Sequence, residues 1–202
     1  MRRTTENRMK KITNKSKKIM KIKMLLLLSV LTLASCNEKK EQIQEFKIDV
    51  KTEEVSENNY KVNIKTNFPE NTSFTIDVQR DYKRKNSSEQ YAGEHYSEFS
   101  TLVKNGEINF DFKADDSKWI NDYKNHQKEN RSFDKTLTDI DFETIKDTLE
   151  ISVLYTPMGE KNEENIELIG KNGEFLKGDG MEKNGTFNVF RKTIKIYNKF
   201  KK

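Results

Sequence analysis

Apolar and polar residues alternate with a period of two through most of the chain beyond residue 45. The pattern is regular over residues 46–50, 60–64, 74–78 and 149–155, where every second residue is apolar. Because successive side chains of an extended strand point to opposite faces, each segment is predicted to be a strand with one buried and one solvated face. One-sided burial of this kind is typical of antiparallel sheets.

Asn-Gly dipeptides mark the predicted turns. Asn105-Gly106 predicts a two-residue type I′ turn, because both residues tolerate positive φ. The hairpin around this turn is expected to pair Lys104 with Glu107, Val103 with Ile108, Thr101 with Phe110, and Phe99 with Phe112. That register places the apolar partners on one face of the hairpin.

Two more Asn-Gly turns follow near the C-terminus. Asn172-Gly173 predicts a second hairpin in which Ile169 faces Leu176, and Asn184-Gly185 introduces the last strand. The apolar residues of that last strand change parity part-way along it. We therefore predict a β-bulge near Arg191.

Residues 115–131 break the alternation. Three residues suited to a helix N-cap come first, namely Asp115, Asp116 and Ser117. The apolar residues that follow are spaced for one face of a helix: Trp119, Ile120 and Tyr123. One short helix near 116–130 is expected.

These elements predict the fold class. Seven or eight strands, turn signals at short spacing and one minor helix favour an all-β fold, a single antiparallel β-sandwich that is immunoglobulin-like in general architecture. No repeat or second linker interrupts the chain after residue 46. Residues 46–202 are therefore expected to form one domain.

An apolar run over residues 24–34, preceded by Lys21 and Lys23, stands before that domain. A helix over this run rises about 16 Å, too short to span a bilayer, so the segment is typical of a secretory signal. The run ends in Leu33-Ala34-Ser35-Cys36, which resembles the lipobox of bacterial lipoproteins, and Cys36 is the only cysteine of the chain. An ordinary secretory signal or a buried apolar segment are the alternatives.

The lipoprotein resemblance implies the processing of the N-terminus. Residues 1–35 would be removed as a signal peptide, and Cys36 would carry a covalent diacylglycerol and a fatty acyl chain. Residues 36–45 would then be the lipidated cysteine and a polar tether. We expect translation to start at Met20, or the first 19 residues to be dispensable, because residues 20–23 alone make a compact basic region.

The charge of the chain depends on that processing. The formal net charge is +5, but residues 1–35 carry ten of the 38 Lys and Arg and one of the 33 Asp and Glu. The remainder has 28 basic and 32 acidic residues, a net charge of −4. A nucleic-acid partner is therefore not expected. The charged cluster after Cys36 resembles the export signal of surface lipoproteins in Bacteroidota-type bacteria, which implies the outer membrane or the cell surface.

Few residues suggest catalysis, and neither a catalytic residue nor a cofactor is predicted. His95 and His126 are the only histidines, and neither lies in a nucleophile-elbow motif. An acidic segment offers a weak calcium candidate, with carboxylates at positions 1, 3, 5, 9 and 12 of a calcium loop: Asp139, Asp141, Glu143, Asp147 and Glu150. Thr144 stands where that loop needs glycine. The alternative is an acidic connector whose apolar residues face the core, namely Ile140, Phe142 and Ile145.

A basic and aromatic stretch between residues 80 and 96 is the candidate recognition surface. Tyr and Arg are favoured at binding hot spots, and long loops on sandwiches commonly carry function. The candidate binding residues are Arg80, Tyr82, Arg84, Tyr91, His95 and Tyr96. The alternative is a solvated crossover whose tyrosines cover the edge of the core.

Taken together, the sequence predicts an exported lipoprotein, anchored to the membrane of the cell envelope by its lipid, whose sandwich domain binds an unidentified protein or glycan. The strand segments loosely resemble extracellular sandwich domains of bacterial lipoproteins that have no assigned activity. Two alternatives stay open. One is a hydrolase that acts on glycans through paired carboxylates, and the other is a lipoprotein that protects its own cell by blocking a toxin or inhibitor.

Overall fold

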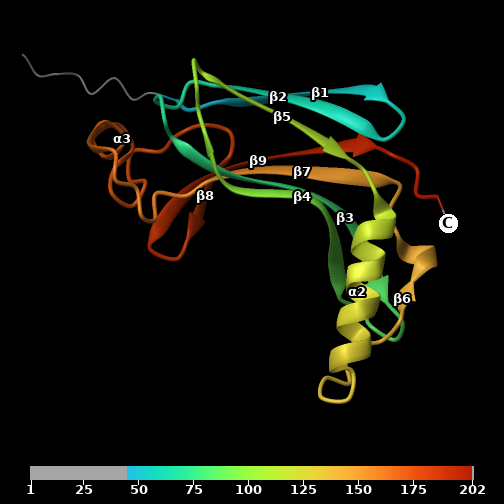
Figure 1. The fold of residues 1–202 in the computed structure, drawn as a ribbon. Helices are drawn as coiled ribbons and strands as arrows, with labels where there is room; N and C mark the ends of the chain where they lie inside the picture. Colours follow the sequence, from blue (N-terminus) through green and yellow to red (C-terminus); the bar gives the residue numbers. More distant parts are fainter. Residues whose placement is uncertain (1–44, 202) are drawn as a thin grey trace, which may run out of the picture. The chain divides into compact units, whose positions relative to one another are not determined.

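Two antiparallel sheets lie face to face in the computed structural model, which describes residues 45–201 (Figure 1). The three-stranded sheet has the order β1-β2-β5, formed by β1 (Ile48–Ser56), β2 (Asn59–Thr66) and β5 (Glu107–Lys113). The larger sheet has the order β4-β3-β7-β9-β8, formed by β4 (Gln90–Leu102), β3 (Ser73–Arg84), β7 (Thr148–Tyr155), β9 (Phe187–Tyr197) and β8 (Met181–Asn184). The two-residue strand β6 (Ile140–Asp141) pairs with β3. The predicted all-β sandwich is confirmed.

The period-two alternation explains the core between the sheets. Tyr60, Val62 and Ile64 of β2 are buried, and they share one apolar cluster with Ile76 and Val78 of β3. The intervening residues of β2 point to the outer face of the three-stranded sheet. The described part of the chain also contains the helices α2 (Asp116–Asn130) and α3 (Glu163–Ile169) and the short 3₁₀ helix η1 (Phe142–Thr144). Within residues 45–201, no helix is long and apolar enough to cross a membrane.

Helix α2 confirms the predicted helix and extends the core. It begins just after β5, and the side chain of its N-cap Asp115 accepts the Ser117 N–H. Figure 1 shows α2 lying over the far part of β3 and β4. A second apolar cluster fills this space, formed by Tyr82, Trp119, Ile140 and Ile145. Strand β3, 12 residues long, therefore serves both clusters with one face.

Gly93 of β4 allows this close packing of α2. A Cβ atom at this position would lie 2.3 Å from Cδ2 of Trp119, well inside van der Waals contact. Any side chain at position 93 would therefore push the Trp119 ring and the helix away from the sheet.

The hairpin predicted around Asn105-Gly106 forms only at its tip. Both turn residues have positive φ, 53° and 73°, and Lys104 pairs with Glu107 as expected. Beyond that pair the prediction is wrong, because β4 pairs with β3 whereas β5 pairs with β2. The turn therefore carries the chain from one sheet to the other. Phe99, predicted to face Phe112, is instead 74% exposed.

Two predictions for the C-terminal third are also wrong. The hairpin around Asn172-Gly173 does not form, because Ile169 is the last residue of α3 and packs in the main core together with Leu176. No bulge occurs near Arg191, because β9 pairs with β7 in unbroken register from Tyr155↔Phe190 to Thr148↔Tyr197. The parity change arises because the adjacent residues Val189 and Phe190 are both buried, on opposite faces of the strand.

Asn184-Gly185 does introduce the last strand, since it joins β8 to β9 with Asn184 paired to Phe187. The predicted signal peptide, the lipobox cysteine Cys36 and the tether as far as residue 44 lie outside the described residues.

Candidate functional site: the outer face of the three-stranded sheet

The residues of the candidate recognition surface lie in different environments, and only the tyrosines belong to the two apolar clusters. Arg80, Tyr82 and the side chain of His95 are buried, and all three face helix α2. Tyr96 packs on the main core and stacks on Phe110, with ring centroids 4.6 Å apart. The structure therefore does not bring the six residues together on one exposed surface.

Arg80 is a buried connector between four segments of the chain. Its Nε donates to Asp116 Oδ1 at 2.7 Å, and its Nη1 donates to the backbone oxygens of Lys146 and Asn198 at 2.6 and 2.7 Å. Its Nη2 donates to Asn198 Oδ1. The guanidinium thereby joins β3 to the start of α2, the segment before β7 and the C-terminal segment.

Asp116 forms the anionic centre of the same cluster. It accepts a hydrogen bond from Trp119 Nε1 at 2.9 Å, and His95 Nε2 lies 3.3 Å from the same oxygen. Burial alone would raise the pKa of Asp116, but the His95 ring, the Trp119 N–H and the Arg80 charge together hold that pKa below its usual value. Asp116 is therefore ionised and balances the buried guanidinium.

The His95–Asp116 pair superficially resembles the base of a hydrolytic site. The His95 side chain is fully buried, however, and neither ring nitrogen has a hydrogen-bond partner in the described residues. A bulge in β4 explains this burial, since Tyr96 pairs with Val78 and Glu94 with Gln79, which leaves His95 as the extra residue. No substrate can reach this histidine while α2 stays in place.

The remaining predicted residues also pack against α2. Tyr82 stacks on Trp119 with centroids 4.8 Å apart, and the Arg84 guanidinium lies 3.8 Å from the centre of the Tyr91 ring and 5.0 Å from that of Tyr123. These contacts attach the helix to the sheet through aromatic and cation–π packing.

The acidic residues of the calcium candidate have separate partners. Asp141 caps η1, Asp147 accepts the Phe200 N–H, and Glu150 pairs with Lys195 at 3.4 Å. Asp139 accepts from Gln127 and lies 3.8 Å from Arg131. Among the residues that the structure describes, no three His, Cys, Asp or Glu side chains are placed to hold a metal ion. Ile140 and Ile145 are buried, as the connector alternative expects.

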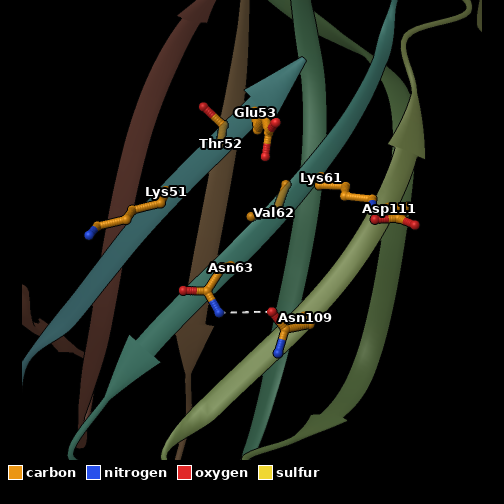
Figure 2. A pocket seen from close by; sticks show the side chains of 8 residues that line it. All are labelled: Lys51, Thr52, Glu53, Lys61, Val62, Asn63, Asn109 and Asp111. Carbon is orange, nitrogen blue, oxygen red and sulfur yellow. Dashed lines mark hydrogen bonds between the residues drawn. The ribbon is translucent and has the colours of Figure 1, made fainter. Parts of the chain in front are cut away.

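A shallow hollow of about 590 Å³ lies on the outer face of the three-stranded sheet (Figure 2). Besides Thr52 and Val62, six outward-pointing polar side chains from all three strands line it, and these six are here called the outer hollow: Lys51, Glu53, Lys61, Asn63, Asn109 and Asp111. Each has the strand parity opposite to the buried residues, so each points away from the core.

Strand register arranges the outer hollow in two rows. One row contains Lys51, Asn63 and Asn109, and Asn63 Nδ2 donates to Asn109 Oδ1 at 2.8 Å. The next row places Lys61 of β2 between Glu53 of β1 and Asp111 of β5. Although opposite charges are neighbours in this second row, no ion pair within 4.0 Å and no side-chain hydrogen bond joins them in the described structure.

The adjacent row along β2 differs. There Lys65 Nζ lies 3.3 Å from Glu107, and this ion pair, together with hydrogen bonds from Asn109 and Asn63, lowers the pKa of Glu107. The charged groups of the outer hollow are thus available to a ligand, whereas those of the neighbouring row already contact each other.

The chain matches no family model, no curated protein and no solved structure. The outer hollow is therefore assessed from its own side chains. Its two lysines and two carboxylates balance, and the amides of Asn63 and Asn109 add donors and acceptors. Such a set can hold a polar ligand by many hydrogen bonds.

Sequence reasoning missed this face, although part of the signal was present. Alternation alone assigns Lys51, Lys61 and Asp111 to the solvent side of their strands. Only the pairing of β2 with β5 brings the three strands together, and the misassigned hairpin had placed β5 beside β4 instead.

Proposed function

We propose that this chain is a lipid-anchored lipoprotein of the bacterial cell envelope, and that its sandwich domain binds a partner through the outer hollow. The anchor rests on the lipobox-like Leu33-Ala34-Ser35-Cys36. Binding rests on one observation above all. Four ionisable side chains on an exposed sheet face, Lys51, Glu53, Lys61 and Asp111, form no ion pair within 4.0 Å and no side-chain hydrogen bond within residues 45–201. They can exchange water for a ligand without breaking an ion pair or a side-chain hydrogen bond.

The hydrolase alternative is less well supported. Glycoside hydrolysis needs two facing carboxyl groups, one of which an apolar environment keeps protonated. Glu53 and Asp111 lie on opposite sides of β2, on an open polar face with Lys61 between them. That environment favours contacts to a ligand over proton transfer to it.

A pull-down tests the binding proposal. The full-length, affinity-tagged protein is incubated with native-envelope material, and the material that it retains is identified. The variant Lys51→Ala/Lys61→Ala removes both cations of the outer hollow. Its matched control is Lys47→Ala/Lys65→Ala, which removes the same charge from neighbouring exposed positions outside the hollow. We expect the wild type and the control to retain the same material and the first variant to lose it. Equal retention by all three proteins would contradict the assignment of the face.

Cys36→Ser tests the lipid anchor. The variant should be recovered in the soluble envelope fraction without incorporated fatty acid, because the sulfur that carries the lipid is absent. Unchanged membrane association of this variant would reject the lipoprotein assignment. If the material that the wild type retains and Lys51→Ala/Lys61→Ala loses is a toxin or an inhibitor, the self-protection alternative is identified. In that alternative the same face binds a protein.

A further inference from the structure

We infer that the ligand of the outer hollow is an uncharged glycan, an inference that rests on the proposed binding function and specifies its partner. The first reason is charge balance. Lys51 and Lys61 are offset by Glu53 and Asp111, and the two remaining polar side chains are neutral amides. A polyanion would meet two carboxylates here, and a polycation would meet two ammonium groups, so neither charge sign is favoured.

The second reason is the composition of the lining. Cores of protein–protein interfaces are depleted of Lys, Glu and Asp and enriched in aromatic residues and Arg, which supply most hot spots. The outer hollow has no aromatic residue and no Arg, and four of its six polar side chains are Lys, Glu or Asp. A protein partner would have to desolvate all four charges without an aromatic or arginine anchor in return.

The third reason is the match of hydrogen-bonding groups. Lysine only donates, an ionised carboxylate only accepts, and the Asn amide does both. A hydroxyl group donates and accepts at once, so one sugar hydroxyl can bridge a lysine and a neighbouring carboxylate that are not joined by an ion pair. Lys61, placed between Glu53 and Asp111, offers two such bridging positions. A peptide strand would gain little here, because backbone groups of a sheet pair at its edges and not on its faces.

The geometry also indicates how tightly a glycan would bind. The volume, about 590 Å³, lies in the range of small-ligand sites, roughly 300–1,000 Å³. With no aromatic ring to stack on the sugar, binding depends on hydrogen bonds that compete with water. We expect Kd values on the order of 0.1–1 mM for a short oligosaccharide.

Titration of the full-length protein, held in a detergent without a sugar headgroup, tests the inference. The probes are neutral gluco-, manno-, galacto- and xylo-oligosaccharides, with heparin oligosaccharides as the anionic comparison. Lys61→Ala should weaken binding of a neutral sugar about tenfold or more, and Asn109→Ala about threefold to tenfold, since they remove a charged and a neutral donor from the hollow. Lys65→Ala, which changes the same charge on the same strand outside the hollow, should change Kd less than about twofold.

Salt and chemical treatments separate the remaining outcomes. Binding of a neutral glycan should be almost independent of salt, whereas stronger, salt-sensitive binding of heparin would overturn the inference. Envelope material retained through Lys51 and Lys61 should be lost after periodate oxidation and should survive protease. Retention that survives periodate and is lost with protease would refute the glycan but leave the binding function intact. If the wild type retains nothing that Lys51→Ala/Lys61→Ala loses, both the glycan inference and the binding function are refuted.

Discussion

Replacement of Arg80 by methionine should destabilise the fold more than any exposed substitution. Methionine fills a similar volume but removes every donor of the guanidinium. Asp116 Oδ1 then loses its Arg80 contact at 2.7 Å, and the backbone oxygens of Lys146 and Asn198 lose theirs at 2.6 and 2.7 Å. Because Arg80 is fully buried, water cannot simply take the place of those donors.

The size of this effect follows from the ion pair between the fully buried Arg80 and Asp116, whose side chain is 15% exposed. Removing one partner of a buried, hydrogen-bonded ion pair costs about 3–5 kcal/mol, because the other charge stays buried without compensation. Asp116 keeps its hydrogen bond from Trp119 Nε1 at 2.9 Å, which favours the lower part of that range. For a chain of this size, about 3–5 kcal/mol corresponds to a decrease in Tm of roughly 6–20 °C.

Urea unfolding of the full-length protein, followed by the fluorescence of the single tryptophan, Trp119, measures this free energy. Arg80→Lys is an informative companion, since it keeps the charge but cannot reach four acceptors in the same geometry, and it should also be destabilising. Arg191→Met is the matched control. Arg191 is exposed and pairs with Glu182 at 3.3 Å, so its loss should cost less than about 1 kcal/mol.

A double-mutant cycle with Asp116→Asn examines the pair itself. The two single changes should not add, and the coupling free energy should be about 1–3 kcal/mol. The proposed structural role of Arg80 would be refuted if Arg80→Met lowered the unfolding free energy by less than about 1 kcal/mol, or if it behaved like Arg191→Met.

Three further outcomes are expected. Gly93→Ala should cost about 1–3 kcal/mol and change the Trp119 emission, because its Cβ would lie 2.3 Å from the ring; an unchanged spectrum and Tm would contradict this packing. Because the pKa of Asp116 is lowered in the folded protein, its ionised carboxylate stabilises the fold at pH values above the unfolded pKa of about 3.9. This stabilisation is lost as the pH falls through the folded pKa. The Tm difference between wild type and Asp116→Asn should therefore shrink below about pH 4, and a constant difference would argue against an ionised Asp116. Gly106→Ala, at φ 73°, should cost about 1–2 kcal/mol in urea unfolding, whereas a neutral effect would argue against the turn.

Local patterns in the sequence predicted the strands and turns well. Alternation over residues 60–64 and 74–78 identified β2 and β3, and Asn105-Gly106 identified a turn with two positive φ angles. These features depend on residues that are close in sequence. The pairing partner of each strand depends on residues that are far apart in sequence. Strand β5 is an example, since it pairs with β2 across some 45 residues while β4, its neighbour in sequence, pairs with β3.

Part of the structural role of Arg80 could be predicted from the sequence. Residue 80 shares its parity with Phe74, Ile76, Val78 and Tyr82, so unbroken alternation along β3 already turns it inward. A single buried arginine is rare without paired acceptors. Those acceptors come from α2, from the segment before β7 and from the C-terminal segment, and no local pattern in the sequence predicts them. Composition alone therefore favoured an exposed binding role.

The network around Arg80 also determines the order in which the domain can be assembled. Asn198, which accepts from Arg80, lies 118 residues after it and 140 residues after Asn58, to which it donates. Contacts of such long sequence separation are slow to form, because a large loop must close before any of them is gained. The interior around Arg80 is therefore incomplete until the segment that contains Asn198 has packed against β3. We therefore expect the hydrogen bonds between Arg80 and Asn198 to form late in folding, after the local contacts within the hairpins.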